Sequence, residues 1–372
     1  MQQAEKDFYP ELEALRGVAA LAVSICHVWM AGAPHDRPFA AFSFGDWLQY
    51  ALTSLSSSEG AVAIFFVLSG FVLSESLRGK PLLTAEVYML FVVRRLFRIM
   101  PALVVAVLIA QAIRHSYFGA SETWSDIMLT TLLLTADLRI DPPLWSLRVE
   151  MAASLIFPLM VFGNRLLAPA VQGTILVGLL CWPRIRWSQE LIIVFLFCFQ
   201  LGLMVRTLGP LINRVPSWLA SAFFGAALLA VMLPTNLSLK GYLGMHTHVA
   251  IEGMGAFYIV AYVWARRSAG LTRALCTRPA RFLGRISYSL YLLNYPIAAV
   301  VLSHMGIADG PFSLPLALTA AAVTLAVNIG LAVLLHRFVE VPFMRAGRWL
   351  QSLIGSTRSH TSTLGEASRV AT

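Results

Sequence analysis

The sequence predicts an all-α polytopic membrane protein with about ten transmembrane helices and both termini in the cytoplasm. Composition is the first indication, because 58% of the 372 residues are apolar and only 13% are charged. A soluble domain carries about 25% charged residues and about 45–50% apolar ones. The mean hydropathy of +0.72 and the grouping of apolar residues into long runs are the other two indications. Much of the chain is therefore expected to face lipid.

The same composition argues against several other classes of protein. The four cysteines, at positions 26, 181, 198 and 276, match neither a disulfide framework nor the spacing of a zinc site. The net charge of +9 is explained by membrane topology, and no basic stripe on a soluble face indicates nucleic acid. We expect no metal site, no bound cofactor and no nucleic-acid partner.

Ten runs approach the length of about 20 mostly apolar residues that a membrane span needs. They cover residues 12–31, 59–77, 98–113, 144–163, 171–183, 189–206, 217–234, 248–265, 284–303 and 314–337. A shorter apolar stretch at 127–134, flanked by Asp126 and Asp137, predicts an interfacial or re-entrant helix. We expect a single integral-membrane domain over residues 1–350 and a flexible polar cytoplasmic tail at 351–372.

The distribution of lysine and arginine orients these spans. With a cytoplasmic N-terminus, 21 of the 28 basic residues fall on the cytoplasmic side, which is the bias that the positive-inside rule describes. Four acidic residues lie before or at the start of the first span, so this span is predicted to be an anchor rather than a cleaved signal sequence. We therefore expect a multi-pass protein of the cell (inner or plasma) membrane.

Polar side chains at span depth are the candidate functional residues, because a buried charge is costly in lipid. Arg16 and His27 in the first span are eleven residues apart, which places them on one helix face, about 16 Å apart along the axis. Taken alone, His27 could equally be a histidine that is hydrogen-bonded between helices. Arg16 could be a flanking charge that snorkels to the surface.

Two further groups carry charge. Arg95 and Arg98 share a helix face at the cytoplasmic mouth of the third span and form a planar pair of donors suited to phosphate. Alternatively, the two arginines only flank the cytoplasmic end of the span, as the positive-inside rule describes. Ser146 and Glu150 project together at the outer start of the fourth span. The carboxylate of Glu150 suits a general base, a group that orients a histidine, or one half of a structural ion pair.

The fourth group is a polar stripe in the ninth span, formed by Ser287, Tyr291 and Asn294. Small polar side chains of this kind often hold membrane helices together. The stripe therefore indicates either a substrate-binding face or a helix contact.

Taken in order along the chain, these stretches resemble acyltransferase family 3, a family of membrane-bound acyltransferases. The matching segments are Leu12–Ala20 with His27, Phe65–Phe71, Arg95–Pro101, Trp145–Leu147 with Glu150, Leu283–Leu292, and Glu340–Pro342. Each motif is weak by itself. The ordered set extends over nearly the whole chain, from residue 12 to residue 342, and is much more specific.

The resemblance implies transfer of an acyl group, typically acetyl from cytoplasmic acetyl-CoA, to a hydroxyl of a glycan, a lipid-linked acceptor or a small acceptor. At the matching positions, His27 is implied as the catalytic base and Glu150 as the recurrent carboxylate. Arg16, Arg95 and Arg98 are implied in acyl-CoA binding. The other matched polar positions are expected to bind the acceptor or to hold helices together: Ser69, Trp145, Ser146, Ser287, Tyr288, Tyr291 and Asn294.

Two positions depart from the family pattern. Asn294 stands where the family usually has a histidine, and Ala63 stands where an acidic residue is common. A competing hypothesis is a transporter or flippase of a lipid-linked glycan or a small solute, in which the same polar groups would line a path. That hypothesis predicts inverted repeats, which are not apparent, and it gives the Arg95 and Arg98 pair no role.

Overall fold

The computed structural model describes residues 9–30, 39–81, 84–135, 137–181, 187–234, 237, 241–307 and 313–352. Within these ranges all regular secondary structure is helical, which confirms the predicted all-α class. The predicted tail lies almost wholly outside the described residues. Its first two residues, Gln351 and Ser352, belong to the last helical segment.

The elements follow one another in an order close to that predicted. They are α1 (Pro10–Met30), η1 (Phe39–Ala41), α2 (Phe44–Leu55), α3 (Ser58–Leu77), α4 (Ala85–Phe118), α5 (Trp124–Thr131), α6 (Leu144–Leu166), α7 (Pro169–Leu180), α8 (Trp187–Leu208), η2 (Gly209–Arg214), α9 (Ser217–Met232), α11 (Met245–Trp264), α12 (Ala269–Leu275), α13 (Arg278–Met305), α14 (Leu314–Leu335) and the π-helical η3 (His336–Glu340). Each of the ten predicted runs falls on one of these helices. The short stretch at 127–134 falls on α5, a separate helix of eight residues.

Not all of these helices are long enough to cross a bilayer alone. In the described part of the chain, seven helical segments are long and apolar enough, and α11 with α12 would make an eighth although a 91° bend separates them. Two apolar helices, α7 and α9, are shorter, with 12 and 16 residues. The number of helices that span the membrane therefore remains a prediction.

Helix α4 is much longer than the run at 98–113 that predicted it. It begins after Thr84, whose hydroxyl accepts a hydrogen bond from the amide of Val87. It ends before Gly119, which has a left-handed φ of 63°. Pro101 lies inside the helix, although proline removes a backbone hydrogen bond. As a result, the arginines that precede Pro101 lie on one continuous helix.

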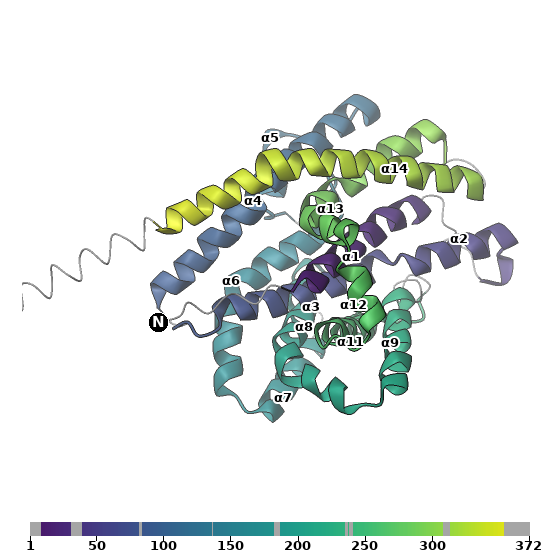
Figure 1. Ribbon diagram of the computed structural model, residues 1–372. Helices are drawn as coiled ribbons and strands as arrows, with labels where there is room; N and C mark the ends of the chain where they lie inside the picture. The colour runs from purple at the N-terminus through teal and green to yellow at the C-terminus, as the bar shows by residue number, and fades with distance from the viewer. Residues whose placement is uncertain are drawn as a thin grey trace, which may run out of the picture.

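Helix α1 lies at the centre of the bundle. Figure 1 shows it with α13 and α14 on one side and α3, α8 and α11 on the other. Its closest approach is to α13, at two glycines. A Cβ atom on Gly17 would lie 2.5 Å from the backbone nitrogen of Gly284, and a Cβ on Gly284 would lie 2.3 Å from the carbonyl oxygen of Glu13. The two backbones are in contact because neither residue has a side chain.

A second glycine pair joins α3 to α8. A Cβ atom on Gly70 would lie 2.3 Å from the carbonyl oxygen of Phe199, and one on Gly202 would lie 2.3 Å from that of Val67. The sequence analysis found Gly70 only as part of a motif. The structure gives it a packing role, which is to let α8 approach the centre of the bundle.

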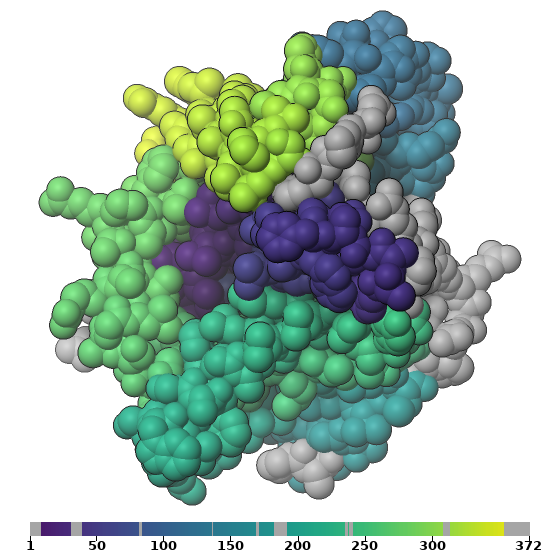
Figure 2. Space-filling model, turned by 90° about the vertical axis from the view of Figure 1, so that its right-hand side faces the viewer, coloured from purple at the N-terminus to yellow at the C-terminus, as the bar shows by residue number. Residues whose placement is uncertain are grey.

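Helix α2 covers the end of the bundle at which α1 finishes. Figure 2 views this end and shows α2, in dark blue, across the middle of the face. The side-chain amide of Gln49 donates to the carbonyl of Trp29 over 2.9 Å. Carbonyl groups in the last turn of a helix have no partner within the helix, so this contact helps to fix the turn of α1 that carries His27.

The two ends of the described chain lie at the opposite end of the bundle. The guanidinium of Arg94 donates to the side chain of Gln351 over 2.8 Å, and Gly347 packs against Phe97. Glu13, near the start of α1, interacts electrostatically with Arg98. Both termini of the described chain therefore lie on the same side of the bundle, as a topology with both ends in one compartment requires.

The contact between Gly17 and Gly284 predicts a sensitive position. We expect Gly17→Ala to lower stability by more than about 1–3 kcal/mol, the usual cost of overpacking, because the new methyl would meet backbone that cannot rotate away. Thermal unfolding of the purified protein in detergent measures this. Gly330→Ala on α14 is the matched control, since a Cβ there meets nothing within 4 Å. Equal unfolding temperatures for the two variants would contradict the prediction.

Candidate active site

The imidazole of His27 lies between α1 and α13. Its Nδ1 atom is hydrogen-bonded to Oδ1 of Asn294, and the edge of its ring meets Tyr295 with the two ring centroids 5.4 Å apart. His27 and Asn294 are 267 residues apart in the sequence. The glycine contact between α1 and α13, ten residues earlier in each helix, brings them together.

The partners of Asn294 determine which nitrogen of His27 carries the proton. The amide Nδ2 of Asn294 donates to the backbone carbonyl of Tyr291. A carbonyl can only accept, so Nδ2 must face Tyr291 and Oδ1 must face His27. Because Oδ1 also only accepts, Nδ1 of His27 is the donor in this bond. The neutral ring then has its lone pair on Nε2.

Glu150 and Arg95 form a buried ion pair between α6 and α4. A guanidinium nitrogen of Arg95 lies 2.7 Å from Oε1 of Glu150, and their side chains are 11% and 19% exposed. Ser154 accepts from Arg95 over 2.9 Å, and Ser69 donates to Glu150 over 3.2 Å. Of the alternatives left open for Glu150, this geometry corresponds to a structural ion pair.

Arg16 and Arg98 have a different environment from Arg95. The two guanidinium groups interact electrostatically with each other, and Arg16 also interacts electrostatically with Glu150 and Glu340. Within the described part of the chain, neither Arg16 nor Arg98 makes an ion pair shorter than 4.0 Å or a hydrogen bond. Two neighbouring guanidinium groups without a direct carboxylate partner are suited to bind an anion.

A narrow cavity of about 30 Å³ brings many of the predicted residues together. Its wall includes one arginine, one carboxylate and four hydroxyl groups, from α1, α6 and α13. These are Arg16, Glu150, Ser146, Ser287, Tyr288 and Tyr291. We refer to it as the inner cavity. Its apolar wall includes Phe65 and Phe66 of α3.

A second and larger cavity, of about 450 Å³, lies toward the ends of α4 and α13. Its lining includes Arg114, Phe118, Ile140 and Tyr295, and we refer to it as the outer cavity. Arg114 is held by Glu122 over 2.9 Å. Tyr295 lines this cavity while its ring contacts His27.

Helix α13 connects the two cavities to His27. Tyr291 lines the inner cavity, Asn294 bonds to His27, and Tyr295 lines the outer cavity. Positions four residues apart lie on the same face of a helix, so this one face extends from one cavity to the other. His27 itself is in the lining of neither cavity.

Other predicted residues have clear packing roles. The hydroxyls of Ser146 and Tyr291 lie 2.6 Å apart, and Tyr288 donates to the carbonyl of Ile99 on α4 over 2.7 Å. Trp145 packs against the ring of Phe195, with the two ring centroids 5.2 Å apart. These contacts hold α6, α13 and α4 around the inner cavity.

Two acidic residues near the site, Glu340 and Asp141, were not predicted from the sequence as site residues. Oε2 of Glu340 accepts from Ser289 over 3.0 Å and pairs with His336 over 2.8 Å, within the π-helical η3. A π-turn is frequent at functional sites, but no sequence pattern singled it out. Glu340 was noted only as part of a terminal motif.

The second missed residue is Asp141, in the loop before α6. It is only 1% exposed, and its Oδ1 atom makes no hydrogen bond within the described part of the chain. It interacts electrostatically with Tyr291 and Tyr295. Burial raises the pKa of this carboxyl well above its ordinary value. The pair of prolines that follows Asp141 signals a turn but does not indicate its burial.

Comparison with known proteins gives one family and one curated relative. Residues 9–337 match the model of a family described as an acyltransferase domain. "Acyltransferase MdmB" of Streptomyces mycarofaciens is 35% identical over 161 residues, a match that covers 40% of this chain and 38% of the relative's length. No solved structure matches. Every predicted site residue lies within the stretch that the family model matches.

The buried ion pair predicts strong coupling between Arg95 and Glu150. We expect Glu150→Leu to lower stability by about 3–5 kcal/mol, because it leaves the Arg95 charge buried without its partner. The double variant with Arg95→Leu and Glu150→Leu should recover most of this loss. Thermal unfolding of the two single variants and the double variant measures the coupling.

An exposed ion pair provides the control for these variants of Arg95 and Glu150. Arg139 and Asp137 lie 2.7 Å apart, but their side chains are 64% and 53% exposed. Asp137→Ala should therefore change stability by less than about 1 kcal/mol. If the losses in the Arg95 and Glu150 variants simply add, the two residues are not coupled and the prediction is wrong.

Asp141 predicts a pH dependence of stability. Its pKa is raised in the folded state, so between its ordinary pKa and its folded pKa the folded protein binds more protons than the unfolded one, and stability falls as pH rises. We expect Asp141→Asn to be more stable than the parent at neutral pH, with a difference that shrinks toward about pH 4. Unfolding temperatures across this range test it, with Asp137→Asn as the exposed control. A difference that is constant with pH would contradict it.

Proposed function

Because the chain belongs to acyltransferase family 3, we propose that it transfers an acyl group from a cytoplasmic acyl-CoA to a hydroxyl group of an acceptor. The acyl group is acetyl and the acceptor is a glycan or a similar hydroxylated molecule. The observation that carries the proposal is the hydrogen bond of His27 with Asn294, on the helix whose neighbouring residues Tyr291 and Tyr295 line the two cavities.

His27 acts as the general base in this proposal. A hydroxyl group is a poor nucleophile at neutral pH, and a neutral imidazole is the usual group that activates it. Nε2 takes the hydroxyl proton while the hydroxyl oxygen attacks the thioester carbonyl. The carbon–sulfur bond then breaks, the thiolate of coenzyme A accepts the proton from Nε2, and the acceptor leaves as an ester.

The donor binds at the end of the bundle where α1 begins. Coenzyme A is polyanionic, and Arg98 and Arg16 offer guanidinium groups that form no ion pair with a carboxylate among the described residues. Arg95 has a different part, because its charge is already matched by Glu150. We therefore assign the phosphate contacts to Arg98 and Arg16, and assign Arg95 to positioning Glu150 at the wall of the inner cavity.

The size of the inner cavity supports a short acyl group. About 30 Å³ has room for only one or two water-sized groups, which favours acetyl over a longer chain. The pantetheine arm enters only if side chains of the wall, such as Phe65, move aside. A charged wall of Arg16 and Glu150 also disfavours an extended hydrocarbon chain.

The acceptor approaches through the outer cavity. Its volume of about 450 Å³ is within the range of about 300–1,000 Å³ that ligand pockets occupy. Aromatic rings and an arginine, as in Phe118, Tyr295 and Arg114, suit a hydroxylated ring that stacks and accepts hydrogen bonds. The two substrates would then meet His27 from opposite ends, in a protein of the cell membrane.

Transfer of radiolabelled acetyl-CoA in inverted membrane vesicles tests the proposal. We expect label to move into a carbohydrate-containing fraction, without an ion gradient. His27→Ala should reduce this transfer by about 10²- to 10⁴-fold, the usual effect of removing a general base. The variant should still fold, because alanine is a good helix former.

His304→Ala is the matched control, since His304 lies on the exposed side of α13. It should retain the parental rate. Transfer by His27→Ala within about tenfold of the parent would exclude His27 as the base. Movement of an unmodified glycolipid or solute across the membrane, with no acyl-CoA consumed, would show a transporter instead.

A further inference from the structure

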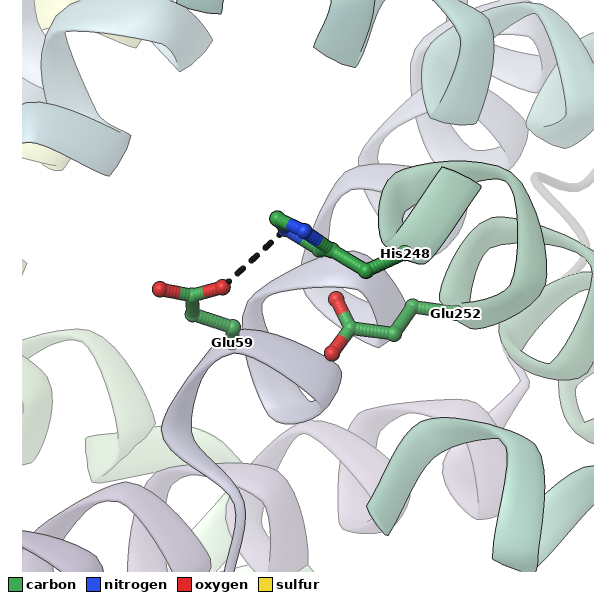
Figure 3. A group of neighbouring side chains, drawn as sticks. All are labelled: Glu59, His248 and Glu252. Carbon is green, nitrogen blue, oxygen red and sulfur yellow. Dashed lines mark ion pairs between the residues drawn. The ribbon is translucent and has the colours of Figure 1, made fainter. Parts of the chain in front are cut away.

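A histidine and two glutamates converge near the end of the bundle that α2 covers. They are Glu59 in the first turn of α3, and His248 and Glu252 in the first two turns of α11. One ligand atom from each residue lies within 4.8 Å of the others. Figure 3 shows the imidazole and the two carboxylates facing one another, with Nε2 of His248 3.2 Å from Oε2 of Glu59.

The backbone holds the two contributing helices in place. His248 and Glu252 are four residues apart, so both project from one face of α11. A Cβ on Gly60, next to Glu59, would lie 1.7 Å from the carbonyl oxygen of Val231 on α9. A Cβ on Gly255 of α11 would lie 2.8 Å from the carbonyl of Ala227, one turn earlier on α9. Helix α9 thus fixes α3 and α11 relative to each other and preorganises the three side chains.

Two of the three side chains are buried, whereas Glu59 is 34% exposed. Glu252 is fully buried, and His248 is 7% exposed. Nδ1 of His248 is also buried and makes no hydrogen bond within the described part of the chain. Nε2 is the nitrogen that faces Glu59, so it is the atom of His248 that can ligate an ion, and a buried Nδ1 without a protein partner is a group that an unrecorded water often explains.

We propose that Glu59, His248 and Glu252 bind a divalent transition-metal ion, with Zn²⁺ as the best match. One imidazole and two carboxylates give a nitrogen and two or more oxygen donors, a set that Zn²⁺ accepts. Zinc ligands lie about 2.0–2.2 Å from the ion. Tetrahedral ligands at this distance from an ion lie about 3.4 Å from one another. The ligand atoms, which lie within 4.8 Å of one another, would therefore have to move together by up to about 1.4 Å. The sequence analysis predicted no metal site, and the two glutamates, nearly 200 residues apart, form no local pattern that would indicate one.

The role of the metal is structural. It joins the outer ends of α3 and α11 through three protein ligands. Helix α3 also carries Ser69, which bonds to Glu150, so the metal would stabilise one wall of the inner cavity without taking part in acyl transfer. This inference does not depend on the identity of the reaction.

The metal content of the purified full chain tests the proposal directly. After dialysis against a chelator, the protein is loaded with Zn²⁺, freed of excess ion and analysed by elemental mass spectrometry together with thermal unfolding. We expect about one Zn²⁺ per chain and a higher unfolding temperature with the ion than without it. His248→Gln and Glu252→Gln should each weaken binding by at least about tenfold.

His304→Gln serves as the control, because it removes a histidine from outside the cluster, and it should bind Zn²⁺ as the parent does. Parent protein that binds no stoichiometric Zn²⁺ would overturn the proposal, whatever the variants do. Equal binding by the parent, His248→Gln and Glu252→Gln would overturn it as well. Because the parent is measured first, a variant that fails to fold does not remove the test.

Discussion

The contact between Gly17 on α1 and Gly284 on α13 is the constraint on which the rest of the candidate site depends. A Cβ on either residue would lie 2.5 Å or less from backbone of the opposite helix. The hydrophobic effect does not drive association between helices that are already in lipid. Close packing of the helix backbones is therefore a main source of their affinity. His27 lies ten residues after Gly17 and Asn294 lies ten residues after Gly284. Their hydrogen bond therefore follows from the glycine contact, because two helices in contact at one point diverge little over this distance.

Much of the fold could be predicted from the sequence, since lipid imposes a simple pattern. Each apolar run of sufficient length forms a helix, and all ten predicted runs coincide with one. Boundaries were less predictable. Pro101 breaks a hydrogen bond but not α4, because a proline within a packed membrane helix can be accommodated. The break between α11 and α12 and the shortness of α7 depend on packing, which hydropathy does not encode.

The candidate site was predictable as a set of residues but not as a set of partners. Helical spacing correctly placed Arg95 and Arg98 near each other, but it could not show that Arg95 pairs with Glu150 while Arg98 does not. Both partners of Arg95, Glu150 and Ser154, come from α6, a helix about 50 residues further along the chain. In the same way, Asp141 and the cluster of Glu59, His248 and Glu252 depend on contacts between distant segments, which no local pattern contains.

The replacement of the usual family histidine by Asn294 is consistent with an active site under the proposed function. The base needs a fixed acceptor for its Nδ1 proton, so that the lone pair stays on Nε2. An amide meets this need only if it cannot flip, since its nitrogen would repel the proton of Nδ1. The backbone carbonyl of Tyr291 prevents the flip by accepting from Nδ2. Asn294 thus orients His27 without titrating, and the proton transfers of the proposed reaction are left to His27 alone.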